Sequence, residues 1–227
     1  IGIMSIGVTM VIVTGGIDLS IGSILAAASI ITARLIYTEV ATPWVAVLIG
    51  LSFGGSLGLI NGLVITRLRV NPFITTLGML TVARGLTYLF ASGLQGTVAS
   101  NVPMRDEGVS FLGNGYVLQQ TFLERGIPFP VILMIVLVVV FTLFLRYTVL
   151  GRQIYAVGSN EVAARLSGVP ANRVKLFVYT LTGVLSALAG IMTAGLLRTA
   201  ATNAGSGVEL DVIAAVVIGG ASLSGGE

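Results

Sequence analysis

The amino-acid sequence predicts an all-α fold, a polytopic bundle of transmembrane helices with broken or re-entrant segments. Three observations predict it: 55% of the 227 residues are hydrophobic, only 9% are charged, and the mean hydropathy is +1.02. A soluble domain carries about 25% charged residues, so this chain could not cover its surface with polar groups. The 30 glycines indicate that the helices approach closely, because transmembrane interfaces use small residues.

Long apolar runs mark the expected spans along the chain. A helix needs about 20 apolar residues to cross the hydrocarbon core. Three uncharged runs reach or exceed that length, namely residues 40–66, 126–145 and 176–197. The run 70–93 is interrupted by Arg84 alone, and two roles stay open for this side chain, reaching toward the interface or pairing with a carboxylate. The uncharged runs 1–17, 19–33 and 212–226 are shorter than a full span.

Two polar loops orient the chain. The loop 146–175 holds five basic residues against Glu161, whereas the loop 94–127 holds two basic and three acidic residues. The positive-inside rule therefore predicts a cytoplasmic loop at 146–175 and an external loop at 94–127. Counting spans from these loops places Arg67 and Arg69 inside. The same count places three charges outside, namely Arg34, Glu39 and Arg198.

The run 40–66 carries a glycine at every fourth position, at Gly50, Gly54, Gly58 and Gly62. This spacing places all four on one helix face, where a neighbouring backbone can come close. We interpret the stripe as a structural packing surface rather than as a sliding one.

Composition excludes several functions. Cysteine and histidine are both absent, which excludes a thiolate nucleophile, an imidazole base, a zinc site and a Ser/His hydrolase. The GxGD motif of intramembrane aspartyl proteases is also missing. The net charge of +3 is too small and too scattered for a nucleic-acid binder. The glycine-rich segment 219–227 lacks GK[ST], and no GxxxxGK[ST] occurs in the chain, so any nucleotide energy would come from another subunit.

Residues 14–22, TGGIDLSIG, separate the first two apolar runs. Gly15 and Gly16 can end one helix, and Asp18 or Ser20 can cap the next through its free N–H groups. A carboxylate at membrane depth is costly, so it should face protein or water rather than lipid. Two interpretations stay open for Asp18, an N-cap at a bend or a part of a substrate path.

A similar piece returns at residues 207–211, where GVELD matches GIDLS of residues 16–20 in residue class. By the span count the two pieces enter from opposite faces, which is the pattern of an inverted repeat whose broken helices line a central site. A match of only five residues also arises by chance, and this alternative stays open. We expect Asp18 and Glu209 to flank a translocation path, with Asp211 in the same segment. Further candidates, chosen by polarity at membrane depth, are Ser20, Ser23, Asn61 and Thr75.

The stretch GSNEVAARLSGVP, residues 158–170, predicts a short helix in the cytoplasmic loop. Asn160 is a good N-cap, Gly168 fits the left-handed position after the last turn, and Pro170 prevents continuation. Glu161 in the first turn complements the helix dipole, and Arg165 is placed to pair with it or with a partner. Such a delimited helix indicates a docking element, with a plain connector as the alternative.

These features resemble the membrane permease subunits of bacterial ABC importers for monosaccharides, the ribose and xylose permease group. Three stretches carry the match and cover much of the chain, namely TGGIDLSIGSILA at 14–26, LGRQIYAVGSNEVAARLSGV at 150–169 and NAGSGVELDVIAAVVIGGASLSGG at 203–226. Weaker agreement runs through residues 71–89. Family members are longer, with a further span before Ile1 and more after Glu227.

The resemblance implies one transmembrane permease domain over residues 1–227, in the bacterial inner membrane, that translocates a monosaccharide by alternating access. It implies no cofactor in this chain, with ATP and Mg bound by a cytoplasmic ABC ATPase. An external, periplasmic sugar-binding protein and a second permease copy or paralogue would complete the assembly in the lipid bilayer. The sequence leaves open which sugar is carried, and whether the permeases form a homodimer or a heterodimer.

The short helix is similar to the family motif that docks in the ATPase, written EAA, three residues, then Gly. Ala163, Ala164 and Gly168 fit, whereas Val162 stands at the usual Glu position and Glu161 lies one place earlier. The coupling residues carried over are Asn160, Glu161, Ala163, Ala164, Arg165 and Gly168. The alternative function is an ion-gradient-driven secondary transporter of a small polar solute, with Asp18, Glu209 or Asp211 as its proton or sodium site.

Overall fold

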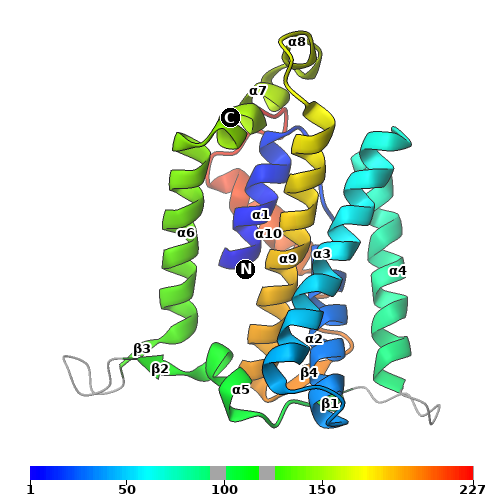
Figure 1. Ribbon diagram of the computed structural model, residues 1–227, viewed down its shortest axis with the longest axis vertical. Coiled ribbons are helices and arrows are strands. Elements are labelled where there is room, and N and C mark those ends of the chain that lie inside the picture. Colours follow the sequence, from blue (N-terminus) through cyan, green and yellow to red (C-terminus); the bar gives the residue numbers. More distant parts are fainter. Residues whose placement is uncertain (93–100, 118–125, 227) are drawn as a thin grey trace.

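The computed structural model describes residues 1–92, 101–117 and 126–226. Within these ranges helices dominate, and the few strands form two short two-stranded ribbons (Figure 1). The elements are α1 (Gly2–Val13), α2 (Ile21–Tyr37), α3 (Pro43–Arg67), α4 (Pro72–Ser92), β1 (Asn101–Pro103), α5 (Glu107–Asn114), β2 (Tyr116–Val117), β3 (Ile127–Pro128), α6 (Phe129–Tyr147), α7 (Val149–Ser159), α8 (Glu161–Leu166), α9 (Ala171–Leu197), β4 (Thr199–Ala201) and α10 (Val208–Ile218).

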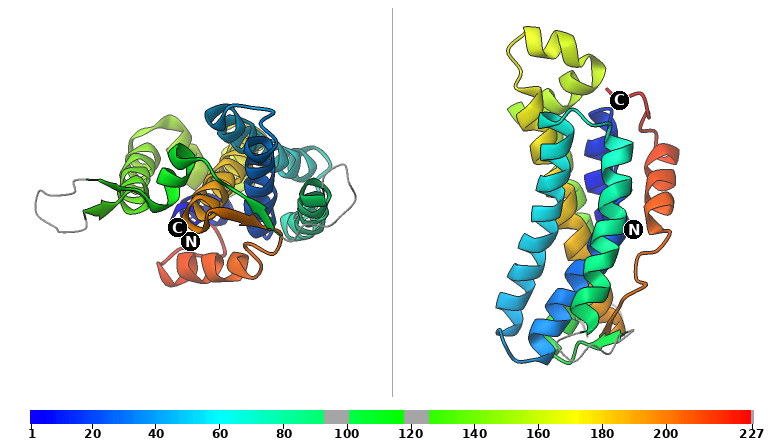
Figure 2. Two further views of the ribbon diagram at one scale, coloured as in Figure 1. Left: turned by 90° about the horizontal axis from the view of Figure 1, so that it is seen from below. Right: turned by 90° about the vertical axis from the view of Figure 1, so that its right-hand side faces the viewer.

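Four helices in the described part of the chain are long and apolar enough to cross a membrane, namely α3, α4, α6 and α9. The all-α polytopic fold class is therefore confirmed. Helices α3, α6 and α9 arise from the three long uncharged runs. Helix α4 adds a fourth span from the run that contains Arg84. Helices α6 and α4 lie on opposite flanks of the bundle (Figures 1 and 2), and α6 buries none of its residues within this chain.

Helix α9 runs through the centre and packs most extensively against α3. The glycine stripe of α3 makes this contact. A Cβ added at Gly54 would lie 2.5 Å from Ala187 Cβ and 2.7 Å from the Gly183 carbonyl oxygen, both on α9. A Cβ at Gly58 would overlap the carbonyl oxygen of Tyr179, also on α9. The expected packing surface is therefore present, and the two backbones meet almost without intervening side chains.

Helix α2, with 17 residues, and helix α10, with 11, start near the middle of the molecule and are called the half-helices below. The chain leaves α1 at the α8 end, turns at Gly15 with a φ of 73° and returns through residues 14–20 to start α2. In the same way α9 ends at the opposite end, where Arg198 adopts a φ of 53°, and residues 199–207 return inward to start α10. The two re-entrant segments thus enter from opposite ends (Figures 1 and 2), as the sequence predicts.

The glycine-rich residues after α10 return to the end of α1. The Gly226 N–H donates a hydrogen bond of 2.9 Å to the Val13 carbonyl oxygen. Gly158 of α7 reaches the same point, since a Cβ there would overlap the Val13 carbonyl oxygen and lie 2.6 Å from Gly226 N. Three distant segments therefore meet at the residue that closes α1. This tight junction gives the segment 219–226 a packing role, in agreement with the absence of a phosphate-binding motif.

The two ends of the bundle differ in charge. At one end, the turn 67–71 lies beside α8, so Arg67 and Arg69 share a groove with residues of the loop 146–175. At the other end, Glu39 lies beside Arg105, and β1 pairs antiparallel with β4. The structure therefore groups Arg67 and Arg69 with the loop 146–175 at one end and Glu39 with Arg105 at the other. Residues 94–100 and 118–125 of the expected external loop lie outside the described residues.

Candidate functional site

Asp18 anchors a buried polar network where the chain enters α2. Its side chain is fully buried, and its Oδ1 accepts hydrogen bonds from the Ser20 backbone N–H at 2.8 Å and the Ser20 hydroxyl at 2.6 Å. Asn61 Nδ2 on α3 donates to Ser20 Oγ at 2.9 Å. Neither side chain caps an N–H within α2 as expected: Asp18 accepts from the N–H of the N-cap residue Ser20, and the Ser20 hydroxyl bonds only the side chains of Asp18 and Asn61.

Two further side chains connect the non-helical segment before α2 to the helices α9 and α4, and neither was predicted from the sequence. The Tyr179 hydroxyl on α9 donates to the Ile17 carbonyl oxygen at 3.3 Å, and the Thr76 hydroxyl on α4 lies 3.5 Å from the same oxygen. Thr75, the candidate from sequence, is only half-buried and donates to the Asn71 carbonyl oxygen on its own helix. The adjacent Thr76 therefore faces the network. Which of the two threonines does so depends on how α4 is rotated about its axis.

Glu209 at the start of α10 lies against the first turn of α2. A Cβ added at Gly22 would lie 2.5 Å from Glu209 Oε2 and would overlap the Gly205 carbonyl oxygen. Gly22 is the second residue of α2 and follows Asp18 by four residues, so the structure brings the two half-helix starts and their carboxylates into one region. Asp211 is exposed and takes no part in this contact.

Four buried side-chain atoms in the described residues have no hydrogen-bond partner, namely Asp18 Oδ2, Ser23 Oγ, Asn61 Oδ1 and Glu209 Oε2. All four belong to residues on the two half-helix starts or on α3 beside them. A buried acceptor without a donor is costly, and each of these atoms can accept a hydrogen bond from a hydroxyl group. The region thus contains several buried hydrogen-bond acceptors without donors.

Arg84 holds the second re-entrant segment in place. Its Nη1 donates to the Thr202 carbonyl oxygen at 2.8 Å and to the Ala204 carbonyl oxygen at 2.9 Å. Non-helical backbone at membrane depth needs such external donors, because its carbonyl groups have no helical partners. The question left open by the sequence is thereby answered: the guanidinium binds backbone rather than a carboxylate or the interface.

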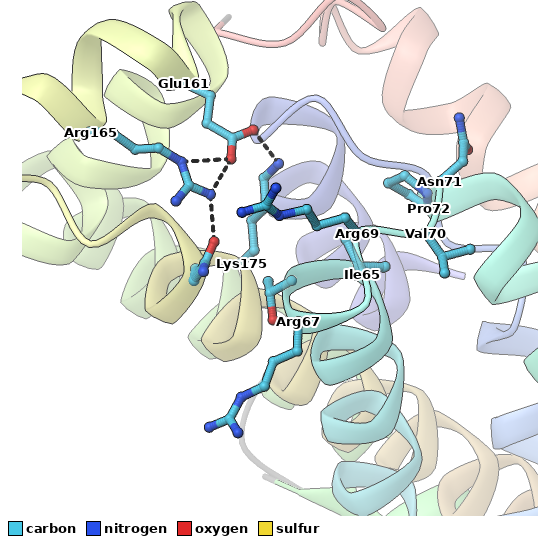
Figure 3. Close-up of a pocket in the computed structure, with 11 residues that line it drawn as sticks. Ile65, Arg67, Arg69, Val70, Asn71, Pro72, Glu161, Arg165 and Lys175 are labelled. Carbon is cyan, nitrogen blue, oxygen red and sulfur yellow. Dashed lines mark hydrogen bonds and ion pairs between the residues drawn. The ribbon is translucent and has the colours of Figure 1, made fainter.

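The short helix predicted within residues 158–170 is present as α8. Asn160 Oδ1 accepts from the Ala163 N–H at 2.9 Å, and Gly168 adopts a φ of 83° after the last turn. Glu161 pairs with Arg165 at 2.7 Å and with Lys175 of α9 at 2.6 Å (Figure 3). Partial burial raises the pKa of Glu161, but the hydrogen bonds and charges of Lys175 and Arg165 outweigh it and lower that pKa on balance. The carboxylate thus fixes α8 to the start of α9.

Known proteins match over nearly the whole chain. The family model described as "Branched-chain amino acid transport system / permease component" matches residues 1–226. The chain belongs to this permease family. The resemblance to the permease subunits of sugar ABC importers is confirmed, and permeases of this family are membrane transport subunits.

Similar relatives of this permease carry names of sugar importers. The ribose import permease protein RbsC of Bacillus subtilis (strain 168) is 45% identical over 99% of this chain and 66% of its own length. The L-arabinose transport system permease protein AraH of Escherichia coli (strain K12) is 38% identical over 99% and 64%. The fructose import permease protein FruF of Bifidobacterium longum (strain NCC 2705) is 36% identical over 97% and 60%. The chain thus spans about two thirds of their length, and no solved structure matches it.

Proposed function

We propose that this permease translocates a monosaccharide, with ribose as the first candidate, across the bacterial inner membrane by ATP-driven alternating access. Its sugar-importing relatives and its two half-helices that start near the middle of the bundle support this proposal. The chain itself would perform no covalent chemistry.

The observation that carries the proposal is helix α8. It is short, capped at both ends and exposed apart from the buried Ala164 and the half-buried Glu161, and the Glu161–Lys175 ion pair fixes it to α9. A connector between two spans needs none of these features, whereas a partner that pushes on α8 requires a rigid attachment. We infer that the partner is a cytoplasmic ABC ATPase, which binds ATP and Mg and contacts the coupling residues, namely Asn160, Glu161, Ala163, Ala164, Arg165 and Gly168.

The path is proposed to pass the starts of α2 and α10. A neutral sugar presents many hydroxyl donors, and the unpartnered oxygens of Asp18, Asn61 and Glu209 are acceptors. Full burial of Asp18 and Asn61 fits an occluded state, in which opening must part the two half-helices. The proposed path residues are Asp18, Ser20, Ser23, Asn61 and Glu209; Thr75 and Asp211, the other two candidates from sequence, do not face the two half-helix starts.

The remaining partners follow from the same proposal. An external sugar-binding protein would deliver the solute at the end that carries α5 and the β1/β4 ribbon. A second permease copy or paralogue would form the other half of the membrane unit. The domain boundaries proposed from sequence, an external loop at 94–127 and a cytoplasmic docking loop at 146–175, belong to this picture.

The test is a Gly168→Glu variant, assembled with its ATPase and binding protein in proteoliposomes. The backbone at Gly168 is left-handed, so a side chain there strains the end of α8 and adds a charge to the docking surface. We expect normal membrane insertion but loss of sugar-stimulated ATP turnover and of uptake. Thr38→Glu adds the same charge at the opposite end and serves as the control.

Unchanged sugar-stimulated ATP turnover in Gly168→Glu would refute the docking role of α8. Uptake by the unmodified assembly that survives ATP depletion, but collapses with the proton gradient, would instead establish the gradient-driven transporter. The two results separate the role of α8 from the energy source.

A further inference from the structure

A basic groove of about 760 Å³ lies at the α8 end, between the turn 67–71 and the docking helix (Figure 3). Its charged lining consists of four cations and one carboxylate, namely Arg67, Arg69, Arg165, Lys175 and Glu161. The formal excess is three positive charges. The carboxylate is already engaged by Arg165 and Lys175, so it does not neutralise the two remaining arginines.

Arg67 and Arg69 have no assigned task within the chain. Both are exposed, and neither makes an ion pair or a side-chain hydrogen bond with any residue that the structure describes. Arg69 adopts a φ of 56°, a left-handed conformation that is unfavourable for a side chain with a Cβ. The Arg69 side chain, directly after α3, extends toward Lys175 in the groove, and Arg67, the last residue of α3, lines the groove at its edge (Figure 3). Strain of this kind is typical of functional positions.

The surroundings of the groove are amphipathic. Leu68, between the two arginines, is 69% exposed, and Val70 and Pro72 line the groove itself. Phe73 and Ile74, at the start of α4, continue this apolar surface along a membrane-spanning helix and are 48% and 62% exposed. An acidic protein surface would match the charges but would leave these apolar side chains uncovered.

We propose that this groove binds the phosphate headgroup of an anionic membrane lipid, whose acyl chains lie along the exposed face of α4. Guanidinium groups match the oxygens of a phosphate in pairs, and basic pockets at the ends of spanning helices suit anionic headgroups. The lipid would sit between the docking helix and the α3–α4 turn. This inference does not depend on which solute the permease carries.

The experiment compares phosphatidylglycerol with phosphatidylcholine of the same acyl chains, titrated into the delipidated permease and followed by native mass spectrometry. We expect preferential retention of phosphatidylglycerol by the unmodified protein. A basic residue near an anionic surface contributes about fivefold in affinity, so Arg67→Gln with Arg69→Gln should weaken that binding by about 25-fold. The matched control, Arg34→Gln with Arg105→Gln, removes two charges at the opposite end and should leave it unchanged.

Arg67→Lys with Arg69→Lys keeps the charges and should retain most of the preference, which separates lost binding from lost folding. Equal retention of both lipids, or an undiminished preference in the glutamine variant, would overturn the proposal. Displacement of phosphatidylglycerol by millimolar inorganic phosphate would overturn it in favour of a free-anion site. Displacement by the purified ATPase would overturn it in favour of a protein-binding surface.

Discussion

Gly54→Ala tests the backbone contact between α3 and α9. The new Cβ would lie 2.5 Å from Ala187 Cβ and 2.7 Å from the Gly183 carbonyl oxygen. Carbon atoms prefer a separation of about 3.5 Å or more, so the helices must part by about 1 Å. Overpacking of this kind costs about 1–3 kcal/mol, which lowers the ratio of folded to unfolded protein by about 5- to 150-fold.

The matched control is Gly78→Ala on α4, where an added Cβ meets nothing within 4 Å. Both substitutions gain the same intrinsic helix propensity of about 1 kcal/mol, so their difference isolates the packing cost. The assay is unfolding in increasing mole fractions of sodium dodecyl sulfate, followed by far-ultraviolet circular dichroism. We expect a lower midpoint for Gly54→Ala than for Gly78→Ala. Adding Ala187→Gly should restore part of the loss, since it removes one of the two clashing atoms.

Equal midpoints for the two alanine variants would refute the interpretation of the stripe as a rigid contact. A lower midpoint without any rescue by Ala187→Gly would place the cost on the Gly183 carbonyl group alone.

Three further outcomes are expected. Arg84→Gln should lower sugar uptake by about tenfold or more at normal expression, because two carbonyl groups lose their charged donor. Arg84→Lys keeps a charged donor and should retain more uptake. Equal uptake by the two variants would contradict the anchoring role of Arg84. Because the pKa of Glu161 is lowered from its ordinary value of 4.5, its ionised form stabilises α8 above that pH and the stabilisation is lost as pH falls through the lowered pKa. A nitroxide on Ser167→Cys should therefore become more mobile in acid, and a persisting transition in a Glu161→Gln background would contradict this. Asp18→Asn and Glu209→Gln should each impair sugar uptake, and normal uptake by both would exclude them from the path.

The spans and the short helix α8 could be predicted from the sequence because their signals are local. An apolar run, and Asn160 with Gly168 at the two ends of a helix, each act within one segment. The pairing of GIDLS with GVELD also predicted two re-entrant segments from opposite faces. Counting the spans between the two pieces was enough to predict that they enter from opposite faces.

The details of the candidate site depend on how helices rotate against one another, which no local signal fixes. Thr75 and Thr76 are adjacent and chemically identical, yet only Thr76 faces the break. Arg84 looked like an interruption, but its partners lie 118 and 120 residues away in the chain. Tyr179 could equally have been a core aromatic. Such contacts are set by tertiary packing, not by pattern.

The junction of Val13, Gly158 and Gly226 has a kinematic consequence. Val13 is the last residue of α1 before the chain turns back toward Asp18, and α7, which leads into α8, contacts it at Gly158 without a side chain between them. With no side chain between them to change rotamer and absorb a shift, displacement of α7 would be transmitted as a rigid stroke to the root of the first re-entrant segment. The mechanical connection from α7 and α8 to the start of the first re-entrant segment is therefore short and stiff.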